Sequence, residues 1–341
     1  MYDIVTFGNA VVDVFLSINN ASDYCRINEQ EEELCVRYGE KIPLARGTFL
    51  LGGNACNVAV GMSRLGFRSA LIAELGNDEF ARKIRNGLKA EGVSGEYLHQ
   101  TNSGSSFSIA LNFAGERTLF VEHVERRHAF VYDGLRTPWF YITSLGVDWR
   151  PAYATILDFA TRSGSRIAFS PGTPQLQEGT SGILPMLRQS EYLFVSRSEA
   201  ARILGDRAPS AATEDVLLRL QALGPRNVVM TSGSSGSDAL DANRRHYHQG
   251  IVRGPVVEMT GAGDSFAAGY LAATMLGRDT PTALLWGSVN ASSVIGQIGT
   301  QPGLLDRTAV QERVTIARNT ELVALNGLHH PVSATYGGRI P

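Results

Sequence analysis

The chain has 341 residues, of which 43% are hydrophobic and 19% charged, and its formal net charge is −2. These values suit a soluble globular protein with one large domain, or a core domain with a small appendage. The absence of a Lys/Arg-rich block disfavours nucleic-acid binding, and no apolar run is long enough for a membrane span. The three cysteines lack metal-ligand spacing, which favours free thiols in a reducing cytoplasm.

Strand-like and helical segments alternate along most of the chain. The first residues, YDIVTFG, are typical of a buried strand and not of a signal peptide, and residues 20–47 are polar with an acidic run typical of solvated surface. Strands are predicted at 2–8, 11–16, 69–76, 140–146, 166–171, 191–196 and 227–233, and helices at 52–66, 78–93, 150–164, 198–205, 260–276 and 281–297. This alternation predicts a parallel α/β sheet with right-handed crossovers.

One pair of strands does not continue this alternation. Residues 105–123 are expected to form two strands around Ala114-Gly115, and with residues near 14–20 they form a small sheet beside the core. We therefore predict one domain over residues 1–325, with lid segments at about 14–20 and 103–125. Residues 326–341 are expected to be a loose tail.

The segment Thr260-Gly261-Ala262-Gly263-Asp264 is the strongest chemical signal in the chain. An apolar strand end is expected before it and a helix after it. Two glycines allow a ligand to approach the backbone, and the free N–H groups at a helix start favour a phosphate. A carboxylate there suits a general base that takes a proton from a hydroxyl while the loop stabilises the transferring group. An ordinary turn with a helix cap is the alternative interpretation.

Two better-known phosphate motifs are excluded. The chain contains no GxxxxGK[ST], and a GxGxxG reading of the segment would need glycine where Phe266 stands. The segment is therefore neither a P-loop nor a dinucleotide fingerprint.

Two long segments resemble the signatures of the PfkB, or ribokinase-like, carbohydrate kinases. TGAGDSFAAGYLAA resembles the C-terminal signature and LGGNACNVAVGMSRLG the N-terminal one. Between them, YLFVSRSEAARILG resembles the Asn-x-x-Glu region of the family, and VVMTSGSSG resembles its nucleotide-site strand and loop. The resemblance implies a central, mostly parallel sheet with helices on both faces and a β lid. It also implies transfer of phosphate from ATP, with Mg²⁺, to a hydroxyl of a sugar or nucleoside, usually a primary alcohol.

The resemblance also implies roles for individual residues. The catalytic base is Asp264, and the anion hole comprises Gly261, Ala262 and Gly263. The substrate residues are Asp13, Gly53 and Asn57; the nucleotide residues are Thr231, Ser232, Gly233, Gly236 and Asn290; and Glu199 organises magnesium through water.

The residues themselves leave simpler roles open. Asn57 lies off the apolar stripe of its helix and suits a sugar diol, but it is also placed to cap the helix locally. Asp13 is alternatively a structural acid bonded to backbone N–H groups. Glu199 is alternatively a first-turn acid that complements the helix dipole, and Thr231 alternatively only ends a strand.

Three residues depart from the family pattern. Ser196 stands where the family has the asparagine of Asn-x-x-Glu, so its link to phosphate or metal water is in doubt. Glu258 and Met259 precede the Thr-Gly-Ala-Gly-Asp core, where a shorter acid and a small polar residue are frequent. A monovalent-cation site is therefore not expected to work as in many relatives.

The substrate stays open between a sugar and a nucleoside, with a sugar preferred. The expected lid carries Phe107, Phe113, Phe120 and His123, which would stack on a ligand or form the core of a two-layer sheet. Arg117, Arg126 and Arg127 would hold a substrate phosphate or remain solvated. A non-catalytic metabolite-binding regulator is a further alternative for the function. The open edges of the lid strands also allow a homodimer formed through the lid.

Overall fold

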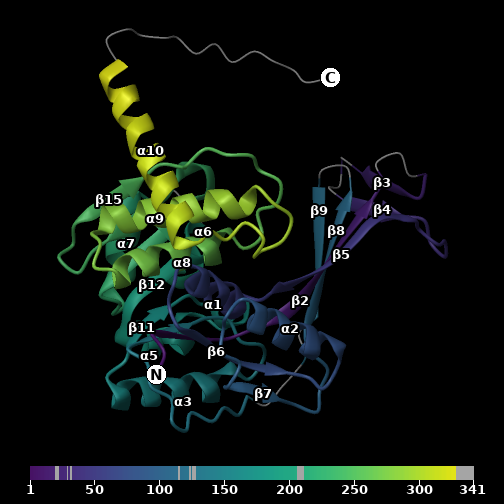
Figure 1. The fold of residues 1–341 in the computed structure, drawn as a ribbon, viewed down its shortest axis with the longest axis horizontal. Coiled ribbons are helices and arrows are strands. Elements are labelled where there is room, and N and C mark those ends of the chain that lie inside the picture. Colours follow the sequence, from purple (N-terminus) through teal and green to yellow (C-terminus); the bar gives the residue numbers. More distant parts are fainter. Residues whose placement is uncertain are drawn as a thin grey trace.

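The computed structural model describes residues 1–19, 23–28, 30, 33–113, 116–122, 124, 128–205 and 211–327. Within them the chain forms a large sheet covered by helices and a smaller sheet beside it (Figure 1). None of the helices in these ranges is long and apolar enough to cross a bilayer. Cys25, Cys35 and Cys56 are free thiols.

The large sheet has nine strands in the order β15-β14-β13-β12-β11-β10-β1-β6-β7. All pairs from β13 to β7 are parallel, whereas β14 and β15 pair antiparallel at the other edge. The strands are Ile4–Phe7 (β1), Ser69–Leu75 (β6), Leu98–Gln100 (β7), Trp139–Ile142 (β10), Arg166–Phe169 (β11), Ser190–Ser196 (β12), Asn227–Thr231 (β13), Ser237–Leu240 (β14) and His246–Gln249 (β15). The predicted mostly parallel sheet is confirmed, and its inner strands are buried on both faces as such sheets require.

Helices cover both faces of the large sheet. One hydrophobic cluster joins the sheet to α3, α5, α6 and α7, and another joins it to α1, α8, α9 and α10. The helices are Asn54–Arg64 (α1), Glu79–Ala90 (α2), Trp149–Ser163 (α3), Thr173–Gln177 (α4), Thr180–Gln189 (α5), Arg197–Leu204 (α6), Thr213–Ala222 (α7), Ala262–Met275 (α8), Thr280–Ile295 (α9) and Arg307–Gly327 (α10).

The smaller sheet, called the second sheet below, has four strands in the order β5-β2-β8-β9. They are Val11–Ile18 (β2), Leu44–Gly52 (β5), Phe107–Phe113 (β8) and Glu116–Val121 (β9). Strand β2 pairs antiparallel with β5 and parallel with β8. The predicted strands near 14–20 and 105–123 are therefore present and share one sheet.

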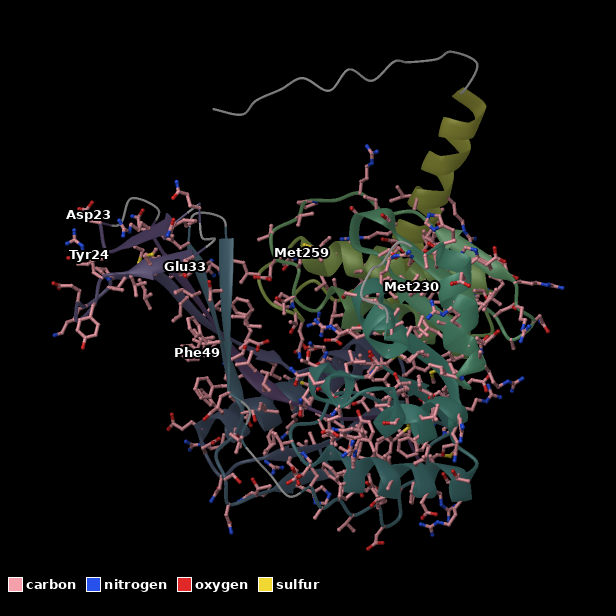
Figure 2. All side chains as sticks on the ribbon, turned by 180° about the vertical axis from the view of Figure 1, so that it is seen from behind. Asp23, Tyr24, Glu33, Phe49, Met230 and Met259 are labelled. Carbon is pink, nitrogen blue, oxygen red and sulfur yellow. The ribbon has the colours of Figure 1, made fainter. Side chains whose placement is uncertain are left out.

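The second sheet is joined to the main body by its own apolar contacts. Val12 and Val14 of β2 pack in a cluster with residues of α1, α2 and β6. A two-stranded ribbon, Cys25–Asn28 (β3) with Glu33–Val36 (β4), extends from its far end, where Figure 2 labels Asp23, Tyr24 and Glu33. This arrangement fixes one side of the sheet against the core and leaves the other side beside the carboxyl ends of the parallel strands (Figure 1).

The structure adds strands that the sequence analysis did not expect and corrects one that it did. Residues 44–52 form β5 because β2 offers them a pairing edge, and the ribbon β3–β4 lies within the polar stretch 20–47. Residues 44–47 stay exposed, in keeping with the polar character of that stretch. The expected apolar strand before Thr260 is wrong, since residues 256–259 form a loop. In this loop the N–H groups of Val257 and Glu258 donate to the carbonyl of Ile295, and the Val257 side chain is exposed.

The expected tail lies almost entirely outside the described residues. Helix α10 continues to Gly327, two residues into the range 326–341. Residues Ala114 and Gly115, the expected turn of the strand pair, also lie outside them.

Candidate active site

A cavity of about 380 Å³ lies between the second sheet and the carboxyl ends of the parallel strands. Ligands of open α/β sheets bind at this edge because the loops that follow the strands converge there. The wall includes Asn9 after β1, Ser144 after β10, Ser170 after β11 and Glu199 after β12. The predicted site residues Asp13, Gly53, Asn57, Glu199, Gly261 and Asp264 all line this cavity.

Asp264 lies in the first turn of α8 and is almost completely buried. The amide of Asn57 donates to its Oδ2 at 2.8 Å, and the amide of Asn54 donates to its Oδ1 at 3.2 Å. Each carboxylate oxygen thus has one amide donor, which orients the group without placing a cation against it.

Burial raises the pKa of Asp264 to about 7. The hydrogen bonds from Asn57 and Asn54 act in the opposite direction, and the charges of Glu199 and Asp13 add to the rise. A carboxylate whose pKa lies near neutral pH is a stronger proton acceptor than an ordinary aspartate and still ionises at that pH.

The start of α8 presents backbone N–H groups that suit an anion, although that of Ala262 also donates to the carbonyl of Met259 at 3.4 Å. Gly261 is the N-cap with φ 81°, and among the described residues no side chain caps the first turn. A Cβ at Gly261 would lie 2.8 Å from Cβ of Thr300, so both the backbone angle and the space require glycine. Gly263 is exposed, with open space where a side chain would be. This is the geometry of an anion site at a helix N-terminus.

Asn57 is held from the other side by a turn that follows α9. Thr300 donates to its Oδ1 at 2.8 Å and Gln301 donates to the same oxygen at 3.1 Å. Because both donors fix the oxygen, the amide nitrogen must point at Asp264. Asn57 is therefore an orienting residue for the carboxylate as well as a wall of the cavity.

Asp13 extends from β2 into the cavity. Its Oδ1 accepts a short hydrogen bond from Ser108 on the neighbouring strand β8. A Cβ at Gly52 would collide with the Asp13 carboxylate, so this glycine makes the space in which the acid lies. Gly53 has φ 95°, and a Cβ there would lie 2.6 Å from the carbonyl oxygen of Asn9.

Glu199 and Ser196 cap α6 reciprocally. The backbone N–H of Ser196 donates to Glu199 Oε2 at 2.7 Å, and the Ser196 hydroxyl accepts from the N–H of Glu199 at 3.3 Å. This is a capping box. Ser196, which stands where the family has an asparagine, therefore has a structural role at the helix start. Glu199 also lines the cavity. Both of its predicted roles therefore stay predictions: an organiser of magnesium through water, and a first-turn acid that complements the helix dipole.

The predicted nucleotide residues lie at the next strand end. Thr231 ends β13 and pairs in register with Ser196, which ends β12. Ser232 follows, and its hydroxyl oxygen is buried without a hydrogen-bond partner among the described residues. Gly233 begins a short 3₁₀ turn, and Gly236 has φ 89° with a Cβ position that would collide with the Gln249 carbonyl.

Asn290 is fully buried inside α9. Its amide nitrogen donates to the carbonyl of Ser265 at 2.7 Å, and its oxygen accepts from the N–H of Leu305 at 3.1 Å. The adjacent residues Val289, Ser292 and Ser293 line a second cavity of about 580 Å³, together with residues 251–255 and part of α10. Asn290 thus supports the helix behind this cavity, and its side chain is not among the lining residues.

The expected lid aromatics take different positions. Phe107 lines the cavity and packs on Phe80 at 5.5 Å between ring centroids. Phe113 is buried in a small cluster with Ile18 and Cys25, and Phe120 is 54% exposed. His123, Arg126, Arg127 and the side chain of Arg117 lie outside the described residues.

Several residues of the site were missed by sequence reasoning. Asn54, Thr300 and Gln301 complete the network around Asp264 and Asn57. Asn54 carried a usable signal, since it lies three residues before Asn57 and so shares its helix face. Thr300 and Gln301 carried none, because they lie more than 240 residues away along the chain.

The fold is shared with solved sugar kinases. The ribokinase of Arabidopsis thaliana, solved with ribose and ATP, aligns with a TM-score of 0.74 at 19% identity over 92% of this chain and 98% of that one. A putative ribokinase II from E. coli, solved with ATP and Mg²⁺, aligns with a TM-score of 0.73 at 16% identity over 93% of this chain and 100% of that one. The architecture is therefore the ribokinase fold.

The chain belongs to the pfkB family of carbohydrate kinases, whose model matches residues 17–307. The fructosamine kinase FrlD of Bacillus subtilis is 30% identical over 74% of this chain and 86% of that protein. A 5-dehydro-2-deoxygluconokinase of Lacticaseibacillus casei is 24% identical over 92% and 96%. A nucleoside kinase of Methanocaldococcus jannaschii is 27% identical over 80% and 88%. The prediction of an ATP-dependent carbohydrate kinase is confirmed at the level of this family.

Proposed function

We propose that this kinase transfers the γ-phosphoryl group of ATP to a primary hydroxyl of a sugar, with Asp264 as the general base. The supporting observation is the position of Asp264. It is a buried carboxylate in the uncapped first turn of α8, and it lines the same cavity as Gly261. The carboxylate suits an alcohol as proton donor, and the helix start suits a phosphate.

The proton transfer follows from the environment of Asp264. The substrate hydroxyl gives its proton to the carboxylate as its oxygen attacks the γ-phosphorus, and ADP leaves. The raised pKa of Asp264 matches a base that works near neutral pH. The N–H groups of Gly261, Ala262 and Gly263 lie at the positive end of α8 and stabilise charge on the transferring group.

Asp13, Gly53 and Asn57 hold the other hydroxyls of the substrate in this proposal. The Asp13 carboxylate accepts hydrogen bonds, and its orientation is fixed by Ser108 and by the space at Gly52. Gly53 brings the backbone to the cavity wall without a side chain. Because these groups are preset, the acceptor hydroxyl is positioned at Asp264 without reorganisation of the site.

ATP occupies the strand ends beyond Asp264. Thr231, Ser232, Gly233 and Gly236 supply small residues and backbone groups there, and the orphaned hydroxyl of Ser232 suits a ligand oxygen. We assign the purine to the second cavity, because its lining residues 251–255 precede the helix start at Gly261 by only a short loop, residues 256–260.

Magnesium fits the site as an ion bound through water and phosphate. Glu199 offers a carboxylate on the cavity wall, and Mg²⁺ favours one or two carboxylates together with waters and substrate phosphates. Among the described residues no group of three acidic, histidine or cysteine side chains is placed to hold a metal. The ion would neutralise phosphate charge, and Glu199 would orient its waters.

A panel assay tests this function. ADP release is measured with D-fructose, a fructosamine, 5-dehydro-2-deoxygluconate, D-ribose and adenosine, each with ATP and MgCl₂. The expected result is saturable turnover with at least one sugar. Turnover with adenosine alone would instead favour the nucleoside kinase, for which the apolar Val11 and Phe107 on the cavity wall offer contacts to a base.

A regulator without activity is the contrasting outcome. It would bind ATP or a sugar in calorimetry but release no ADP with any member of the panel. The buried carboxylate argues against that outcome, because burial of an ionisable group costs stability and groups with such a raised pKa are typical of functional sites.

A further inference from the structure

The cavity contains a histidine that the site described above does not use. His128 lines the cavity, and its side chain is 5% exposed. Its Nδ1 lies 2.7 Å from Oε2 of Glu74, whose side chain is 4% exposed. Its Nε2 is buried and has no hydrogen-bond partner among the described residues. A buried ring nitrogen without a partner is costly unless a ligand completes it.

The ring of His128 is fixed in place. Phe130 stacks on it with centroids 6.1 Å apart and an interplanar angle of 5°. Phe130 is in turn held edge-on by Phe7 and His99. Rotation of the imidazole would break both the stacking and the bond to Glu74. The direction in which Nε2 points is therefore set before any ligand arrives.

Glu74 decides which nitrogen carries hydrogen. A carboxylate only accepts, so Nδ1 of His128 must be the donor, and Oε1 of Glu74 also accepts from the N–H of Ala129 at 3.3 Å. Nε2 then accepts a hydrogen bond when the ring is neutral and donates one when the ring is protonated. A hydroxyl pairs with Nε2 in both states, because it is both a donor and an acceptor.

A glycine lies beside Nε2. Gly146 also lines the cavity, and a Cβ at that position would lie 3.9 Å from Nε2. This glycine places no side chain against the nitrogen, whereas a branched side chain would lie against it.

We propose that His128 is a substrate-binding residue that hydrogen-bonds one hydroxyl of the sugar through Nε2, with Glu74 as its positioning residue. This inference rests on the proposed sugar kinase function and adds the chemical feature by which the cavity selects among sugars. A site built around such a group rejects an analogue that lacks the hydroxyl, because Nε2 is then left buried and unpaired.

Matched variants separate binding from folding. His128→Asn keeps an amide nitrogen near the position of Nδ1, so it can still donate to Glu74, but it removes Nε2. Gly146→Val leaves the histidine intact and covers Nε2. The control is His99→Asn, which alters another neighbour of Phe130 that does not line the cavity.

The experiment uses the sugar of the panel with the highest kcat/KM and each of its single-deoxy analogues. His128→Asn and Gly146→Val should raise KM for that sugar about 10- to 100-fold, with KM for ATP and Tm near wild type. His99→Asn should leave both KM values within about three-fold. Glu74→Gln should raise KM for the sugar a few-fold, and adding it to His128→Asn should cause no further rise, since a positioning residue acts only through the histidine.

The deoxy series identifies the contact. One analogue should lose about 10-fold or more in kcat/KM with the wild-type enzyme and much less with His128→Asn. If both cavity variants keep the wild-type KM for the sugar, or if every analogue loses equally in wild type and variant, the inference is wrong while the kinase function stands. If no sugar is turned over, calorimetric binding of the panel to the same variants decides the inference separately.

Discussion

At the scale of single residues, the environment of Asp264 combines burial with a matched pair of donors. Burial raises the pKa, and the amides of Asn57 and Asn54 limit that rise while they orient the two oxygens. A helix cap needs none of these features. The proposed role of Asp264 as a base therefore rests on its surroundings and not on its sequence position alone.

Replacing Asp264 by Asn is expected to lower kcat by roughly 10²-fold or more, because the variant cannot accept the proton. Its amide oxygen can still accept from Asn57, so the chain should fold and bind ATP. KM for ATP should change little, since the interaction matters most in the transition state. Steady-state kinetics and the Tm shift caused by ATP-Mg²⁺ measure these quantities. Turnover within a few-fold of wild type would show that Asp264 is not the base.

Replacing Asp13 by Ala should raise KM for the sugar about 10- to 100-fold, because a hydrogen bond to a charged acceptor is lost. KM for ATP should stay near wild type. Gly52→Ala should have a similar effect, since its Cβ would displace the Asp13 carboxylate. Asp158→Ala, which removes an exposed acid on α3, is the control. Both KM values come from the same assay, and an unchanged KM for the sugar in Asp13→Ala would contradict the substrate role.

At the scale of elements, the ends of α6 and α8 are used differently. The start of α6 is closed by its own capping box, whereas that of α8 is left without a side-chain cap and faces the cavity. A closed helix start has few donors left for a ligand, and an open one has several. This contrast supports the proposed anion site at α8 and gives Ser196 a structural role at the start of α6.

Ser196→Ala is accordingly expected to destabilise the fold by about 1 kcal/mol, the usual effect of losing an N-cap, with kcat within a few-fold of wild type. Ser196→Asn should keep the Tm of wild type, because asparagine is also a good N-cap. Thermal unfolding and turnover of both variants test this. A large loss of kcat in Ser196→Ala at unchanged Tm would show that the hydroxyl acts on phosphate or metal water instead.

The loop before α8 also bears on the expected monovalent-cation site. Oε1 of Glu258 accepts from the N–H of Thr260 at 3.1 Å and from its hydroxyl at 2.7 Å, and Met259 is exposed (Figure 2). With this oxygen engaged inside its own turn, we expect weak or absent activation by potassium. Rates in sodium, potassium and bulky organic cation buffers at one ionic strength provide the comparison. A large, saturable rise in kcat with potassium alone would overturn this expectation.

At the scale of the whole molecule, the raised pKa of Asp264 couples stability to pH. The folded chain keeps the Asp264 proton up to about pH 7, whereas the unfolded chain loses it near 3.8. Between these values the folded state binds more protons, so the free energy of unfolding falls as pH rises and levels off above pH 7. The full effect is about 4 kcal/mol at most.

Asp264→Asn should remove this dependence. Its stability relative to wild type should increase from pH 4 to pH 7 and then stay constant, as measured by unfolding at a series of pH values. A difference between the two proteins that does not change with pH would mean that Asp264 ionises normally in the folded state. When kcat/KM of the wild-type enzyme is measured at the same pH values, it should rise with pH up to about 7, because only the ionised carboxylate accepts the proton.

Much of this protein follows from local sequence signals. The alternation of strands and helices predicted the parallel sheet, and Gly261 to Asp264 marked the helix start that we propose to be catalytic, because backbone angles and helix starts depend on neighbouring residues. Asp13 and Asn57 were also predicted, through the family signatures around them. These features lie within short stretches of chain and so can be read without knowing the tertiary structure.

Other features were decided only by the tertiary structure. Thr300 and Gln301 orient Asn57 across more than 240 residues of chain, and Glu74 fixes His128 across 54. Strand β5 exists because β2 supplies its pairing edge, and the loop 256–259 is not a strand because its N–H groups bond to the end of α9 instead. Hydrogen bonds and strand pairing between distant segments depend on which surfaces the folded chain brings together, and no local pattern of residues encodes that choice.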